Sequence, residues 1–244
     1  MTQTAVIVQA RMGSTRLPQK VMMPLAGQTV LAHVLERCRA IDGVDTVCCA
    51  TTIAPEDAVI VAEAERCGAA VFRGSPTDVL DRYARAAKMV DADVVMRVTS
   101  DCPLIDPEIC AAVLRLRAEK GVEYAANNMP PGWPHGLDCE AFSADALARA
   151  AKTADDPLER EHVTPWLRNN PSISRASLKG PGGSLTDLRW TLDYPEDMDF
   201  FEALFAKLPN TPSTAGTAEV LEILQRFPEI SAINQTRRDN SRKT

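Results

Sequence analysis

The first 130 residues alternate between short apolar runs and longer segments with helical spacing. Residues 4–10 form a nearly continuous apolar run, which is typical of a strand buried on both faces. Residues 29–40 carry apolar side chains at helical spacing, and Thr29 is placed to cap the first turn. The pattern repeats, predicting strands at 45–51, 69–72 and 93–99 and helices at 55–67, 77–90 and 107–120. This alternation predicts an α/β fold with a mainly parallel sheet and helices on both faces.

The pattern loosens after residue 124. Residues 127–136 are rich in Pro and Gly and predict a loop. Helical spacing returns at 156–169, 196–208 and 217–227, and a strand-like run at 188–192 precedes the second of these. Without a repeat or a clean linker, we expect one domain over residues 1–230, with an arm inserted at about 125–185. Residues 231–244 are expected to form a frayed tail.

Composition narrows the class of protein. The 244 residues are 45% hydrophobic and 25% charged, so a sizeable core can form without disulfides or metals. The net charge of −6 disfavours general binding to nucleic acid or to a membrane surface. No apolar stretch approaches the roughly 20 residues of a membrane helix, and no targeting segment is recognisable. Seven cysteines without metal-ligand spacing favour reduced core thiols, so we expect a cytoplasmic protein.

The connection between the first strand and the first helix has the chemistry of an anion site. It runs to about 18 residues, where roughly two to six would suffice, and it follows the carboxyl end of a strand, where such sheets bind ligands. Basic side chains and a tight turn with exposed amides both suit phosphate oxygens: Arg11, Arg16, Lys20, Gly13, Ser14 and Thr15. The alternative is a solvated loop that binds nothing, because neither common phosphate-binding fingerprint is present.

Two aspartates follow predicted strands at points where the chain turns. Asp101 lies two residues before Pro103, and Asp193 lies two residues before Pro195. Mg²⁺ typically takes one or two carboxylates and completes its shell with phosphate oxygens and water. Two strand-end aspartates facing one cleft would meet that need, although each alone could equally cap the following helix.

Residues that could bind an acceptor are marked less sharply. Asp138 and Glu140 stand two apart, so on a strand they share one face, where they could bind sugar hydroxyls or meet solvent. His135 and His162 are further candidates, although a lone histidine is more often packed or on the surface. No Ser-His-Asp or Cys-His arrangement indicates a nucleophile.

The string VQARMGSTRLPQKV resembles the opening of the CMP-sugar cytidylyltransferases. That family includes the 3-deoxy-manno-octulosonate and acylneuraminate cytidylyltransferases, and the resemblance is greatest to the spore coat polysaccharide biosynthesis protein F group. Its pattern R-x-x-S-x-R-x-x-x-K is matched by Arg11, Ser14, Arg16 and Lys20. Further blocks follow in order: FRGSPTDVLDRY, VTSDCPLIDP, HGLDCEAF, EREHVTP and RWTLDYPEDM. Together they span roughly residues 4–205 and imply a three-layer, Rossmann-like nucleotidyltransferase fold.

The resemblance implies a Mg²⁺-dependent enzyme that activates an acidic or nonulosonic sugar with CTP for surface polysaccharide synthesis, as a homodimer. It assigns the metal to Asp101 and Asp193, and neutralisation of the leaving pyrophosphate to Arg11, Arg16 and Lys20. It places a larger set at the nucleotide: Ala10, Arg11, Met12, Gly13, Ser14, Arg16, Lys20, Arg73, Gly74, Asp78, Asp81, Arg82 and Ser100.

Alternatives exist for several residues and for the function. Asp78 could cap the helix at 77–90, and Asp81 with Arg82 could be an exposed helix pair. A glycosyltransferase using a nucleotide sugar would share the fold and the metal, whereas a non-catalytic nucleotide-binding partner of a polysaccharide pathway would need no metal pair. We treat Lys20 as a surface residue whose replacement by Met leaves stability nearly unchanged.

Overall fold

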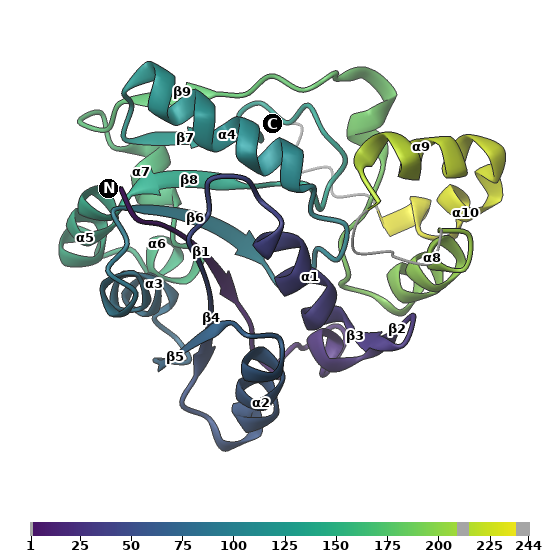
Figure 1. Cartoon of the computed structure of the whole chain (residues 1–244), viewed down its shortest axis with the longest axis horizontal. Helices are drawn as coiled ribbons and strands as arrows, with labels where there is room; N and C mark the ends of the chain where they lie inside the picture. The colour runs from purple at the N-terminus through teal and green to yellow at the C-terminus, as the bar shows by residue number, and fades with distance from the viewer. Residues whose placement is uncertain (1, 209–214, 238–244) are drawn as a thin grey trace.

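The computed structural model describes residues 2–208 and 215–237, and it contains the alternation expected for the first half (Figure 1). The elements are β1 (Thr4–Gln9), α1 (Val30–Arg39), β4 (Thr46–Thr52), α2 (Ala58–Arg66), β5 (Ala70–Gly74), α3 (Val79–Met89), β6 (Val94–Thr99) and α4 (Pro107–Lys120). Thr29 caps α1 by accepting a hydrogen bond from the amide of Ala32, as its position predicts. The predicted helix at 55–67 begins with a 3-10 turn, η2 (Pro55–Asp57).

One strand of the seven-stranded sheet runs against the others. The strand order is β5-β4-β1-β6-β8-β7-β9. β8 (Glu140–Ser143) is antiparallel to both β6 and β7 (Tyr124–Ala126), while β9 (Arg175–Ser177) is parallel to β7. The segment that we expected as an arm therefore extends the main sheet. It also carries α5 (Ala144–Thr153), α6 (Pro157–His162) and α7 (Pro165–Asn169).

The second half of the chain corrects several expectations. Residues 188–192 form no strand; Arg189 makes only an isolated bridge with His135. The helix predicted at 156–169 is two helices, because Val163 between them has a φ of 70° that no helix permits. The helix α5 was not predicted. The later helices are α8 (Pro195–Phe205) and α9 (Thr217–Arg226).

The expected frayed tail is ordered in its first part. The end of helix α10 (Pro228–Ile233) and the turn η4 (Gln235–Arg237) lie where we expected fraying, and Asn234 between them is buried against the body of the protein. The remainder of that tail, 238–244, lies outside the described residues.

Alternating strand residues build two cores, one on each face of the sheet. Val6 and Val8 point into the core that α1 and α4 cover, and Ile7 points into the core beneath α3 and α5 (Figure 1). All seven cysteines are buried and none is in a disulfide. The three layers thus follow from strands that are apolar on both faces.

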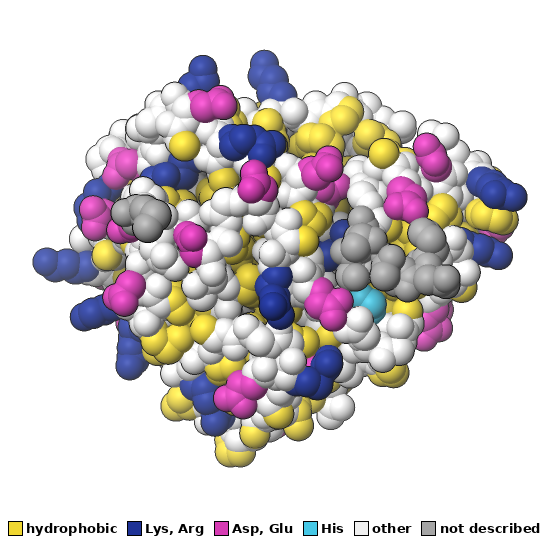
Figure 2. Space-filling model, in the orientation of Figure 1, with side chains coloured by type: hydrophobic (Ala, Val, Ile, Leu, Met, Phe, Trp, Pro, Cys, Tyr) yellow, Lys and Arg dark blue, Asp and Glu magenta, His cyan; other side chains and the backbone are white. Residues whose placement is uncertain are grey.

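The outer surface carries mixed charge on the face shown in Figure 2, where acidic and basic side chains are interspersed. Within residues 2–208 and 215–237, every helix is too short or too polar to span a bilayer.

Candidate active site

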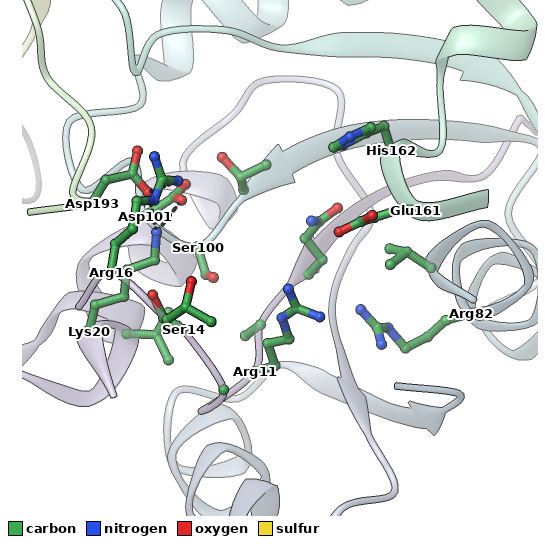
Figure 3. A pocket seen from close by; sticks show the side chains of 17 residues that line it. Arg11, Ser14, Arg16, Lys20, Arg82, Ser100, Asp101, Glu161, His162 and Asp193 are labelled. Atoms are coloured by element: carbon green, nitrogen blue, oxygen red, sulfur yellow. Dashed lines mark hydrogen bonds and ion pairs between the residues drawn. The ribbon is translucent and has the colours of Figure 1, made fainter. Parts of the chain in front are cut away.

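A cavity of about 330 Å³ opens at the carboxyl ends of β1 and β6 (Figure 3). Its wall includes many of the residues singled out in the sequence: Ala10, Arg11, Gly13, Ser14, Arg16, Lys20, Arg82, Ser100, Asp101, His162 and Asp193. It also includes Thr15 of the predicted anion loop, and residues that sequence reasoning did not assign: Gln9, Val21, Val79, Thr99 and Glu161. A polar Gln9 at the end of an otherwise apolar strand was the available signal for the first of these.

The loop after β1 is fixed at its start by a buried carboxylate. Asp57 accepts a hydrogen bond from the amide of Met12 at 2.8 Å, and also bonds the hydroxyls of Thr51 and Thr52 and the amide of Thr52. The Met12 carbonyl accepts from the amides of Ser14 and Gln19. Both backbone groups of Met12 are therefore engaged in these hydrogen bonds. Met12 does not line the cavity, although the resemblance places it at the nucleotide.

Lys20 bridges Asp101 and Asp193. Its Nζ donates to Asp101 Oδ2 at 2.7 Å, to Asp193 Oδ1 at 2.9 Å and to the Leu192 carbonyl at 2.8 Å (Figure 3). The Lys20 side chain is only 12% exposed, so our treatment of it as a surface residue was wrong. Removing its charge would leave two buried carboxylates without their shared partner.

Electrostatics keep this cluster ionised. Burial alone would lower the pKa of Lys20, but Asp101 and Asp193 raise it above its ordinary value. Burial likewise opposes ionisation of Asp101, yet Lys20 outweighs it and lowers the Asp101 pKa to about 2. Lysine and carboxylate are therefore both charged near neutral pH.

Further guanidinium groups surround Asp193. Arg16 donates to Asp193 Oδ1 at 2.8 Å, and Arg189 donates to Oδ2 at 3.1 Å. Neither aspartate caps a helix, because Asp106 caps α4 and Asp197 accepts the amides at the start of α8. The capping alternative is thus removed for both.

The two aspartates converge on one positively charged group. Asp101 Oδ2 and Asp193 Oδ1 both contact the Lys20 ammonium, so they approach one positively charged point from different segments. Hard oxygen ligands of this kind suit Mg²⁺. No cluster of three or more His, Cys, Asp or Glu side chains that could hold a metal occurs in the described part of the chain. A cation here would complete its shell with phosphate oxygens and water.

The opposite end of the cavity carries unpaired hydrogen-bonding groups. Arg82 is 2% exposed, and its Nη1 donates to the Ser75 carbonyl while its Nε has no partner among the described residues. Gln9 Oε1 is likewise buried without a described partner. Glu161 and His162 lie above Arg11 and Arg82 in Figure 3, on α6. Gln9 and Arg82 both line the cavity, so its wall contains a guanidinium donor and a side-chain amide.

Four residues expected at the nucleotide are engaged elsewhere. Asp78 caps α3 and pairs with Arg160, as the capping alternative predicts. Asp81 faces Arg85 at 3.7 Å. Arg73 donates to the carbonyls of Thr52 and Ala54, and Gly74 is buried, where an added Cβ would lie 2.9 Å from Phe72. None of the four lines this cavity, because each serves the fold around β5 and α3.

Glu140 corrects the acceptor assignment most clearly. It is 1% exposed, and it pairs with Arg97 and Arg168 and bonds Tyr124 and Thr164. These partners lower the pKa of Glu140 against its burial and leave it no access to a sugar.

The other acceptor candidates divide between the cavity and the scaffold. Asp138 and His135 lie outside the cavity wall, and the His135 backbone bonds Leu188 and Trp190. His162 is the one acceptor candidate that lines the cavity.

Comparison with curated proteins finds relatives in polysaccharide synthesis. The spore coat polysaccharide biosynthesis protein SpsF of Bacillus subtilis is 32% identical over 87% of this chain and 90% of its own. A 3-deoxy-manno-octulosonate cytidylyltransferase of Anaeromyxobacter is 43% identical over 53% of this chain and 52% of its own.

Solved structures share the fold. A cytidylyltransferase from Leptospira borgpetersenii superposes with a TM-score of 0.89 at 29% identity, covering 94% of this chain and 97% of that one. CMP:2-keto-3-deoxy-manno-octonic acid synthetase complexed with CTP has a TM-score of 0.65 at 18% identity, covering 84% and 99%. The Rv0371c protein of Mycobacterium tuberculosis with manganese has a TM-score of 0.55 at 15% identity, covering 85% and 100%.

A family model for cytidylyltransferases matches residues 5–224, a span that includes the loop after β1, Asp101 and Asp193. The chain therefore belongs to the cytidylyltransferase family.

Proposed function

We propose that this protein transfers CMP from CTP to a sugar and releases pyrophosphate, with Mg²⁺ held by Asp101 and Asp193. The observation that carries the proposal is the convergence of both carboxylates on Lys20 inside the cavity. The names of the relatives support CTP as donor and a surface-polysaccharide sugar as acceptor. The manganese complex of a protein with this fold supports a divalent cation.

The proposed chemistry is an in-line displacement at the α-phosphorus. A sugar hydroxyl oxygen forms the new bond while the bond to the pyrophosphate oxygen breaks. Arg11, Arg16 and Lys20 line the cavity, where they would neutralise the leaving pyrophosphate. When bound, the cation supplies charge stabilisation at the reacting phosphate. Orientation and charge neutralisation are therefore the work of this site.

We propose that the Gln9 and Arg82 end of the cavity receives the cytosine. Cytosine presents one amino donor beside ring and carbonyl acceptors, and the Gln9 amide and the Arg82 guanidinium that line this end carry groups to match them. An anion would not favour the glutamine oxygen or the nearby Glu161 at this end. His162 is the remaining candidate for a sugar contact.

Pyrophosphate release tests the function. The wild-type enzyme is mixed with CTP and Mg²⁺ across a panel of nonulosonic and deoxy sugars, and at least one sugar should support turnover. Release of a nucleoside diphosphate or CMP from a nucleotide sugar, without any pyrophosphate from CTP, would establish the glycosyltransferase alternative. Binding of CTP without any turnover would leave a nucleotide-binding partner.

Thermal shifts test the choice of base. CTP should raise the melting temperature more than ATP, GTP or UTP, because ligands that bind only the native state stabilise it by mass action. Gln9→Leu should reduce the advantage of CTP over UTP, whereas Arg73→Ala, outside the cavity, should not. Equal shifts for all four nucleotides would refute the assignment of the cytosine.

A homodimer and a cytoplasmic location stay predictions.

A further inference from the structure

The C-terminal segment reaches the candidate metal site through a buried asparagine. Asn234 follows α10 and is 2% exposed. Its Nδ2 donates to the Arg189 carbonyl and to Asp197 Oδ1, each at 3.0 Å. The Asn234 side chain therefore contacts the backbone of Arg189, whose guanidinium bonds Asp193. It also contacts Asp197, which pairs with Arg189.

The Arg189–Asp197 pair, which Asn234 contacts, bonds both the backbone and the side chain of Asp193. Arg189 donates to both oxygens of Asp197 at 2.8 Å, a bidentate arrangement that fixes the guanidinium plane. Asp197 Oδ2 accepts the amides of Asp193 at 2.8 Å and of Tyr194 at 3.0 Å. Arg189 also donates to Asp193 Oδ2, which leaves Oδ1 toward Lys20.

A second contact joins the same segment to Tyr194, the residue that follows Asp193. The Arg237 guanidinium lies 4.5 Å from the centre of the Tyr194 ring, and Arg16 lies 5.2 Å from it. Arg237 also donates to Glu196 at 2.7 Å. The residues that follow α10 therefore contact Arg189, Asp197 and Tyr194, which surround Asp193.

Hydrogen bonds, rather than tight packing, hold Asn234 in place. A cavity of about 40 Å³ adjoins it, lined in part by Trp190 and Phe200. The indole Nε1 of the buried Trp190 has no partner among the described residues. The two donated bonds of Asn234 connect the C-terminal segment to the Arg189–Asp197 pair.

We propose that Asn234 is a positioning residue for the cation at Asp193, an inference that rests on the proposed metal-dependent function. Asn234 holds the Arg189–Asp197 pair in position, and that pair determines which carboxylate oxygen of Asp193 faces the cation. Residues that orient a metal ligand from outside typically change metal affinity by roughly ten- to a hundredfold when lost. The C-terminal segment is then part of the active site without touching substrate.

Mn²⁺ binding measures this role without turnover. Free Mn²⁺ is followed by electron paramagnetic resonance during titration of the full chain with CTP and no sugar. Asn234→Ala should raise the Mn²⁺ dissociation constant about tenfold. Gln235→Ala, an exposed neighbour in the same segment, is the matched control and should bind Mn²⁺ as the wild type does. CTP affinity without a cation should stay the same in both variants.

Asn234→Ser keeps one hydrogen-bonding group and gives a second test should the alanine variant fail to fold. It should weaken Mn²⁺ binding less than alanine does. Wild-type Mn²⁺ affinity in folded Asn234 variants would overturn the proposal, as would an equal loss in Gln235→Ala or a wild type that binds no Mn²⁺. A wild type that binds Mn²⁺ and CTP but releases no pyrophosphate with any sugar contradicts the proposed function alone.

Discussion

Two clusters of buried charge lie along the same part of the sheet, and they differ in what they face. Lys20, Asp101 and Asp193 meet beyond the end of β6, where Asp101 keeps 24% of its side chain exposed to the cavity. Glu140 sits opposite Arg97 in the β6–β8 ladder and is 1% exposed.

Each cluster joins carboxylates to basic side chains: one lysine contacts two aspartates in the first, and two arginines contact one glutamate in the second. The first has room for a ligand, whereas Tyr124, Thr164 and Arg168 close the second around Glu140. Access to a cavity, rather than burial or pairing, therefore separates a candidate catalytic carboxylate from a scaffold one.

Asp101→Asn and Asp193→Asn should give the largest effect. Turnover should fall at least roughly a thousandfold, because several kcal/mol of charge stabilisation at the phosphate is lost. Steady-state pyrophosphate release at saturating Mg²⁺ measures it, with circular dichroism as the check of folding. Near wild-type turnover in either variant would remove that aspartate from the metal assignment.

Glu140→Gln should instead reduce stability. The free energy of unfolding should fall by about 3 kcal/mol, because Arg97 and Arg168, which are partly buried, would lose the charge they share. Urea denaturation measures the loss, and kcat per folded molecule should be nearly unchanged. A stable but inactive variant would erase the difference between the two clusters.

Lys20→Met tests the lysine that joins the first cluster. The rate should fall by roughly a hundredfold to a thousandfold, the usual loss for one transition-state charge donor. Lys20→Arg should recover part of that rate. Unlike a surface change, Lys20→Met should also lower the free energy of unfolding by about 1–3 kcal/mol, because its charged hydrogen bonds are buried. A fully active Met variant would argue that Lys20 only packs.

The smallest expected effect is the loss of stability in acid that comes from protonation of Asp101. Its pKa in the folded protein is about 2 against an ordinary 3.8, so its contribution is complete above about pH 4 and is lost as the pH falls toward 2. The loss amounts to about 2 kcal/mol in the free energy of unfolding. Denaturation of wild type and Asp101→Asn at both pH values should show the difference between them shrinking by that amount. A constant difference would contradict the ion pair with Lys20.

Local signals predicted the first half of the fold well. Pro107 and Gly121 bracket α4, and its bounds agree with the prediction because proline suits the first turn and glycine the left-handed stop. Thr29 and Asp101 were placed by the same kind of short-range reasoning. The sheet after β6 could not be derived in this way, because β8 inserts between β6 and β7 through long-range pairing.

The prediction of the site was limited in the same way, by long-range contacts. Arg16 and Lys20 share one loop, and both line the cavity as the motif implies. The fate of Glu140 depended on Arg97, Arg168 and the antiparallel register of β8, none of which is adjacent in sequence. Sequence alone therefore identified acidic residues near strands, but not which ones open on the cavity.

The anchoring of Met12 by Asp57 has a consequence for protein engineering. Asp57 is 1% exposed and gathers the start of the loop and the end of β4 onto one carboxylate. An exchange of the loop between relatives would therefore fail as a simple cassette unless Asp57 and its two threonines travelled with it. In directed evolution of this scaffold for new donors, the loop and the η2 turn would have to be varied together, although 45 residues of chain separate Met12 from Asp57.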